Sequence, residues 1–125
     1  LAPPFVTAKS WAIMDGRTGE ILFGKCENDR REIASLTKIM TAFVVIQIIR
    51  KIKLNAKKTL LQVSKNAASI GGTSAKLKSG DVLSVYDLLH ALMLPSGNDA
   101  ATCLAEHFGQ YLFEVATRHK NNKQQ

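Results

Sequence analysis

Aromatic residues, cysteines and long apolar runs are all scarce in this sequence of 125 residues. Phe, Trp and Tyr together make up 6%, and they do not alternate with basic residues, which argues against a nucleic-acid-binding surface. The longest apolar run, residues 39–49, is too short to span a bilayer and contains Thr41 and Gln47. There is no signal-peptide pattern and no internal repeat. Nothing here predicts a membrane span.

The two cysteines, Cys26 and Cys103, match neither the spacing of metal ligands nor the Cys-x-x-Cys redox motif. Cys103 lies in an apolar helical stretch and is expected to be a small core residue, while a disulfide between the two stays open. His90, His107 and His119 have no carboxylate or cysteine partner at motif spacing. We therefore expect structural histidines, with neither a metal nor a cofactor.

Hydrophobic residues make up 46% of the chain, which is enough for the core of one domain. The chain has 17 Lys and Arg against 10 Asp and Glu, giving a net charge of +7. These basic residues are scattered along the sequence, so the charge indicates a solvated face with a modest preference for anions.

Turn signals and apolar periodicity predict an α+β fold in which an N-terminal β-hairpin packs on a mainly helical region. The hairpin comprises residues 9–14 and 21–25, joined by a turn at 15–20 that contains two glycines. The expected helices cover residues 33–50, 84–94, 100–108 (ended by Gly109) and 111–119, with a short strand at 59–63, a loop with a helical turn at 66–76 and a polar tail at 121–125.

The segment from Ile33 to Arg50 is apolar on nearly every side, so we expect it to be a helix buried in the core. Ser35 and Lys38 stand three residues apart at its start, which places them on one face. One reading makes Ser35 an N-cap and Lys38 a solvated residue of the first turn. The other makes them a nucleophile and its base, since a serine needs an adjacent base and burial favours the neutral form of a lysine.

A second polar motif, Ser96-Gly97-Asn98, stands on a tight loop between two predicted helices. Together with the surroundings Ile33-Ala34-Ser35-Leu36-Thr37-Lys38-Ile39-Met40-Thr41 and Leu92-Met93-Leu94-Pro95-Ser96-Gly97-Asn98-Asp99-Ala100-Ala101, it resembles the D-alanyl-D-alanine carboxypeptidases, which are low-molecular-mass penicillin-binding proteins of peptidase family S11. The resemblance runs from about Ser10 to Gly109.

The resemblance implies that residues 1–120 are the N-terminal part of a catalytic domain with the β-lactamase/DD-peptidase-like fold, and that its remaining sheet strands are missing. It implies Ser35 as the nucleophile, Lys38 as the base, Ser96 as a proton relay and Asn98 as a ligand of the substrate amide. The implied substrate is a peptidoglycan pentapeptide ending in D-Ala-D-Ala, with β-lactams as inhibitors and an extracytoplasmic location, periplasmic or at the cell surface.

The third motif of such enzymes, Lys-Thr-Gly, is absent after Asn98. Lys78-Ser79-Gly80 precedes Ser96 and so has the wrong order, and Ser64-Lys65-Asn66 lacks the surroundings of the second motif. Losing one oxyanion-hole donor costs roughly a hundred- to thousandfold in rate. We therefore expect this chain to be inactive or half of an active enzyme.

Two further readings stay open: a non-catalytic penicillin-binding-protein-like module and a β-lactamase-like hydrolase. The β-lactamases typically have Ser-Asp-Asn as the second motif, where this sequence has Ser-Gly-Asn.

Overall fold

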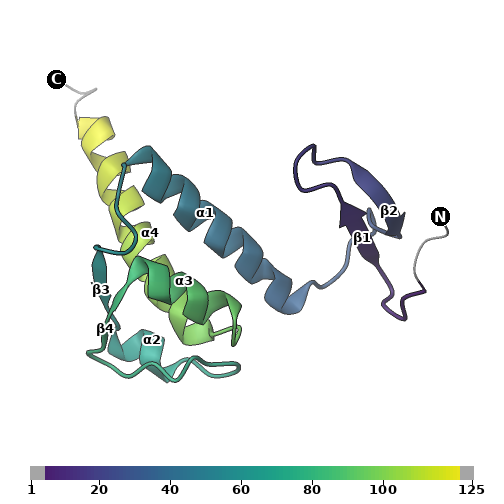
Figure 1. The fold of residues 1–125 in the computed structure, drawn as a ribbon. Coiled ribbons are helices and arrows are strands. Elements are labelled where there is room, and N and C mark those ends of the chain that lie inside the picture. Colours follow the sequence, from purple (N-terminus) through teal and green to yellow (C-terminus); the bar gives the residue numbers. More distant parts are fainter. Residues whose placement is uncertain (1–4, 122–125) are drawn as a thin grey trace. The chain divides into compact units, whose positions relative to one another are not determined.

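The computed structural model describes residues 5–121, and of residues 119–121 it describes the backbone alone. The chain divides into two compact units, one ending at Ile33 and one beginning at Ala34 (Figure 1). The first unit is a hairpin and the second contains all the helices. The packing of the hairpin on the helical region stays a prediction.

The first unit is the expected antiparallel hairpin of β1 (Trp11–Met14) and β2 (Ile21–Lys25). Its turn forms because the Asp15 carboxylate accepts hydrogen bonds from two backbone N–H groups of the turn, at 2.8 and 2.9 Å. Gly19 follows with φ of 78°, a left-handed conformation that glycine adopts without a steric penalty.

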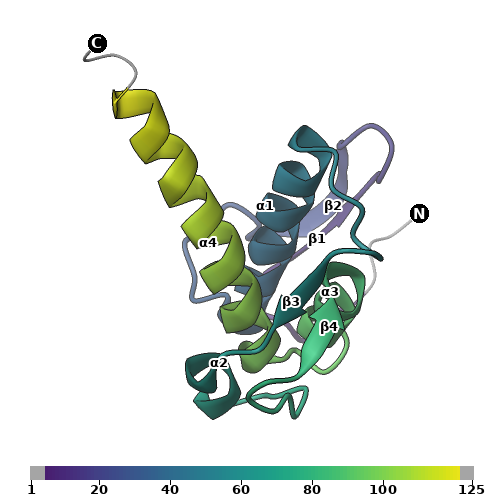
Figure 2. The same cartoon turned by 90° about the vertical axis from the view of Figure 1, so that its left-hand side faces the viewer.

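The second unit begins with a 3₁₀ turn, η1, and combines four helices with a two-stranded antiparallel sheet (Figure 2). The elements are η1 (Ala34–Leu36), α1 (Thr37–Lys51), β3 (Leu60–Gln62), α2 (Lys65–Ser69), β4 (Val82–Ser84), α3 (Val85–Met93) and α4 (Asn98–Asn121). The short strand β3 agrees with the predicted strand at 59–63. Its partner β4 is not predicted, because it has only three residues between a turn signal at 77–81 and the helix cap Ser84.

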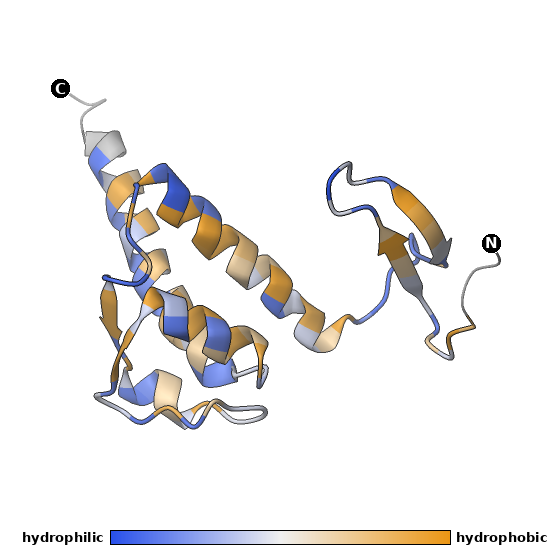
Figure 3. Ribbon diagram, viewed as in Figure 1, coloured by the Kyte–Doolittle hydropathy of each residue, from blue (hydrophilic) through white to orange (hydrophobic). Residues whose placement is uncertain are grey.

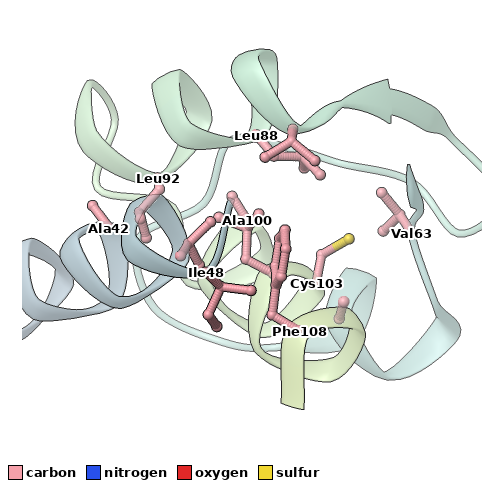
Figure 4. Packing of buried hydrophobic residues seen from close by; sticks show 12 residues of the cluster. Ala42, Ile48, Val63, Leu88, Leu92, Ala100, Cys103 and Phe108 are labelled. Carbon is pink, nitrogen blue, oxygen red and sulfur yellow. The ribbon is translucent and has the colours of Figure 1, made fainter. Parts of the chain in front are cut away.

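Helices α1, α3 and α4 share a hydrophobic core with Ala67 of α2 and with Val63, which follows β3 (Figure 4). Leu88, Leu92 and Leu104 are fully buried at its centre, and Cys103 is buried beside them. Helix α3 starts where predicted, because the Ser84 hydroxyl oxygen accepts a hydrogen bond from the Asp87 N–H at 3.0 Å. This packing fixes the ends of α1 and α4 that carry the polar motifs.

Within this unit α1 is buried on one side, and the expected burial of its other sides stays a prediction, as does the packing of the hairpin on it. Helices α3 and α4 pack on one side of α1, where Ala42, Val45 and Ile48 are buried. The other side has no partner within residues 34–121, and Figure 3 shows how apolar the helix is along its length. Apolar composition predicted the helix, but a helix buries only the faces that neighbouring elements cover.

The expected break at Gly109 is wrong, because α4 runs without interruption from Asn98 to Asn121. The predicted helices at 100–108 and 111–119 are therefore one helix. Of the predicted polar tail, Asn121 closes α4 and residues 122–125 lie outside the described residues.

Across residues 5–121, no helix is both long and apolar enough to cross a membrane. Both cysteines are free thiols, with Cys103 buried as predicted and Cys26 exposed. The architecture is the predicted α+β fold.

Candidate active site

Ser35 and Lys38 lie beside each other at the start of α1. Ser35 is in the 3₁₀ turn η1, and Lys38 is the second residue of the helix that follows. The Lys38 Nζ donates a hydrogen bond to the Ser35 Oγ at 3.3 Å, and the lysine is only 8% exposed.

The alternative reading of this pair, as a cap and a solvated lysine, does not fit the geometry. The N-cap position of α1 is Leu36, and no side chain caps the helix there. Lys38 is buried, and within the described chain the only ion pair joins Arg31 to Asp29. A hydroxyl held against a buried amine is the arrangement that activates a serine nucleophile.

The second motif occupies a tight loop between α3 and α4. Ser96 has φ of 57°, a left-handed conformation that is uncommon for a residue other than glycine. Its carbonyl oxygen accepts a hydrogen bond from the Thr73 hydroxyl. Gly97 is buried behind it, and a Cβ there would lie 2.7 Å from the Ala91 carbonyl oxygen. The loop therefore requires glycine at position 97.

Asn98 is held by the segment Gly71–Lys78, which we call the 71–78 loop. The Asn98 N–H donates to the Thr73 carbonyl at 2.7 Å, and the Asn98 Nδ2 donates to the Gly71 carbonyl at 2.8 Å. Gly72 makes room for this contact, because a Cβ there would lie 2.6 Å from the Asn98 Nδ2. Since the amide nitrogen is engaged by the loop, the orientation of the Asn98 carboxamide is fixed.

Ser35, Lys38 and Asn98 line one pocket of about 400 Å³. Its other lining residues are Ala34, Thr37, Thr41 and Ala101. The structure thus brings three of the four predicted site residues together from two distant parts of the chain. Ser96 is two residues from Asn98 but is not among the lining residues of this part of the structure.

The two short motifs that imitate the family's motifs, at residues 64–66 and 78–80, have structural roles. The Ser64 hydroxyl oxygen accepts from the Ala67 N–H at 2.9 Å and so caps α2. Lys78 and Gly80 stand in a turn, in which the Lys78 N–H donates to the Asp81 carboxylate at 2.8 Å. Neither motif lines the pocket that holds Ser35.

Histidines and metal-ligating groups stand apart from the pocket. The ring nitrogens of His90 and His107 contact the backbone carbonyls of Tyr86 and Gln62, at 2.8 and 2.9 Å. In the region for which side chains are described, no three His, Cys, Asp or Glu residues lie close enough to hold a metal ion. The pocket lining offers hydroxyls, the Lys38 amine and the Asn98 carboxamide.

Sequence reasoning did not assign roles to Thr73 and Gly71, although both hold the second motif in place. Their segment is rich in small residues, with Gly71-Gly72 as a loop signal. Its backbone carbonyls accept hydrogen bonds from Asn98, and the residue types of the segment do not reveal such contacts. Only a three-dimensional arrangement could show these contacts.

Comparison with known families gives a match over most of the chain. The model of the family Peptidase_S11, described as D-alanyl-D-alanine carboxypeptidase, matches residues 1–111. The chain is 38% identical over 111 residues to the D-alanyl-D-alanine carboxypeptidase DacD of Escherichia coli, covering 84% of this chain and 28% of that protein. It is 37% identical over 101 residues to DacF of Bacillus subtilis, covering 79% of this chain and 25% of that protein.

Solved structures agree with the sequence comparison. The crystal structure of DacD from Francisella tularensis aligns with a TM-score of 0.76 at 41% identity, covering 87% of this chain and 26% of that one. Penicillin binding protein 6B from Escherichia coli aligns with a TM-score of 0.72 at 37% identity, covering 86% of this chain and 35% of that one. The chain spans about a quarter to a third of the length of the relatives it matches.

Proposed function

The chain belongs to the peptidase S11 family, and from this premise we propose that residues 1–120 are the nucleophile-bearing part of a serine-type D-Ala-D-Ala carboxypeptidase. The observation that carries the proposal is the pocket shared by Ser35, Lys38 and Asn98. A peptidoglycan stem peptide ending in D-Ala-D-Ala is the proposed substrate. Family relatives named as D-alanyl-D-alanine carboxypeptidases support that choice.

In the proposed acylation step, the Ser35 Oγ attacks the carbonyl carbon of the penultimate D-alanine. The hydroxyl proton passes to the Lys38 Nζ, which lies 3.3 Å from the Ser35 Oγ and is therefore in reach. The peptide C–N bond then breaks and leaves an ester on Ser35. Since Ser35 lies in the turn that leads into α1, the N-terminal N–H groups of that helix favour the negative charge that develops on the carbonyl oxygen.

Ser96 and Asn98 complete the proposed reaction. The Asn98 carboxamide in the pocket wall would bind the amide of the substrate and orient the peptide. The Ser96 hydroxyl would pass the proton from Lys38 to the departing D-alanine amine, and water would then hydrolyse the ester. The place of Ser96 in the sequence supports this role, because it stands two residues before Asn98, which lines the pocket with Lys38.

Penicillins would inhibit this site by the same chemistry, since attack of Ser35 on a β-lactam carbonyl opens the ring and leaves an ester. The peptidoglycan substrate implies a location outside the cytoplasmic membrane, periplasmic or at the cell surface. Fractionation of cells that produce the protein, followed by detection with an antibody, checks this location.

The proposed activity is tested by D-alanine release from a synthetic pentapeptide that ends in D-Ala-D-Ala, using the protein as its gene encodes it. We expect release from this peptide and none from a matched peptide ending in L-Ala-L-Ala. Ser35→Ala should abolish release, because it removes the nucleophile. Ser69→Ala should preserve it, because the Ser69 hydroxyl donates to the Asn66 carbonyl and does not line the pocket. Release that survives in Ser35→Ala would refute the proposed nucleophile. A parent that folds and releases nothing would support a non-catalytic module instead.

A further inference from the structure

The Asp99 carboxylate is the most heavily bonded acidic group near the pocket. Asp99 is the second residue of α4 and only 1% exposed. Its Oδ1 accepts from the N–H groups of Ala75 at 3.0 Å and Ala100 at 2.9 Å. Its Oδ2 accepts from the Ser74 hydroxyl at 2.8 Å and the Leu77 N–H at 3.0 Å. Three of the four donors belong to the 71–78 loop.

The N-terminal half of the same loop holds the second motif, Ser96-Gly97-Asn98. The Thr73 hydroxyl donates to the Ser96 carbonyl, and the Thr73 carbonyl accepts from the Asn98 N–H. The 71–73 half thus contacts the motif, while Ser74, Ala75 and Leu77 donate to Asp99. Because the two halves are continuous, a loop released from Asp99 would also lose its hold on Ser96 and Asn98.

Asp99 also packs directly against the second motif, at Gly97. A Cβ at Gly97 would lie 2.6 Å from the Asp99 Oδ1 and 3.1 Å from the Ala75 nitrogen. The carboxylate therefore fills the space directly behind the loop that carries Ser96. A left-handed serine is a strained conformation, and it persists only where its surroundings fix it.

A carboxylate suits this place because it offers only acceptors and meets only donors. Burial acts to raise the pKa of Asp99, but the hydrogen bonds from Ala75, Leu77, Ser74 and Ala100 outweigh it and lower the pKa. An asparagine of the same shape would turn an NH₂ group towards N–H donors and leave buried donors unpaired.

We propose that Asp99 is a positioning residue for the reaction: by binding the 71–78 loop, it holds Ser96 and Asn98 in their reactive places. The inference rests on the proposed function, because it assigns a purpose to the geometry of that site. Asp99 does not line the pocket, so it acts through the loop and not on the substrate. A carboxylate that served only the dipole of α4 would need no donors from a distant loop.

The test compares Asp99→Asn with Glu106→Gln in the protein as its gene encodes it. Glu106 is a matched control, because its carboxylate also lies on α4 and accepts from Ser64 and Asn66, away from the pocket. The readout is the rate of acylation at saturating fluorescent penicillin, corrected for the folded fraction. Asp99→Asn should lower it by about 10- to 100-fold, as small misplacements of catalytic groups do, and Glu106→Gln should leave it unchanged.

Amide hydrogen exchange tests whether Asp99 holds the 71–78 loop, independently of whether the protein reacts with penicillin. In Asp99→Asn, the N–H groups of Ala75, Leu77 and Asn98 should exchange faster while the core of α3 stays protected. A parent that penicillin does not acylate refutes the proposed function, and exchange alone then decides whether Asp99 holds the loop. Faster exchange with a parental acylation rate would make Asp99 structural only and overturn the positioning role.

If Asp99→Asn does not fold, Ser74→Ala serves in its place, because it removes one of the four hydrogen bonds and keeps the carboxylate. It should give a smaller fall in the same acylation rate. An unchanged rate together with unchanged exchange in this variant would contradict the proposal.

Discussion

Ser35 and Lys38 show what spacing can predict about single residues. Three residues of separation placed them on one face, and the structure puts their polar atoms 3.3 Å apart. The burial of Lys38 could not be predicted from that spacing, because the wall of its pocket includes Asn98 and Ala101 from α4. The spacing in the sequence therefore predicted that the two side chains meet, whereas the burial of Lys38 depends on the packing of α4 against α1.

The two thiols should differ sharply in reactivity. Burial, with the nearby charges of Glu106 and Asp99, raises the pKa of Cys103 to about 11, whereas Cys26 is exposed. Since the thiolate is the reactive form, iodoacetamide at pH 8 should alkylate Cys26 in the folded protein and leave Cys103 unmodified. Peptide mass mapping before and after denaturation checks this. Rapid alkylation of Cys103 in the native protein would contradict the buried geometry.

At the scale of elements, most helices and strands followed from periodicity and caps, and the errors have identifiable causes. Glycine costs about 1 kcal/mol in a helix interior, which predicted an end at Gly109. The structure continues α4 through it, with Phe108 buried just before and Tyr111 packed against the core just after. Tertiary packing on both sides of a single glycine outweighs its intrinsic cost.

Substitution of two different glycines by alanine should therefore change the stability of the protein in opposite directions. Gly109 is helical, and a Cβ there would meet no atom within 4 Å, so Gly109→Ala should stabilise the protein by about 0.5–1 kcal/mol. Gly97→Ala should destabilise it, because its Cβ would collide with the Asp99 carboxylate and the Ala91 carbonyl.

Urea denaturation of both variants and the parent gives the two free energies of unfolding. A loss of stability in Gly109→Ala would show that α4 does not continue through that position.

Helix α1 illustrates a limit of composition as a guide to burial. Its apolar residues surround the helix, yet α3 and α4 cover only one side within residues 34–121. Hydropathy predicts which residues can be buried. The neighbouring elements determine which of these residues are buried in the folded chain.

At the scale of the whole molecule, the order of the motifs carried more information than any one of them. Ser35-Leu36-Thr37-Lys38 and Ser96-Gly97-Asn98 are each short, but both in the right surroundings predicted the family that the comparisons show. Three of the four predicted residues then proved to line one pocket. The contacts of the 71–78 loop could not be predicted, because they involve backbone carbonyls and one buried carboxylate.

The central claim is that Ser35 is the nucleophile of this pocket, and the site of penicillin attachment tests it most directly. The protein as its gene encodes it is incubated with benzylpenicillin, digested and mapped by mass spectrometry. We predict a penicilloyl ester on Ser35 that is lost in Ser35→Ala. A folded protein that carries no adduct, or an adduct on Ser96 or Ser64, would contradict this account.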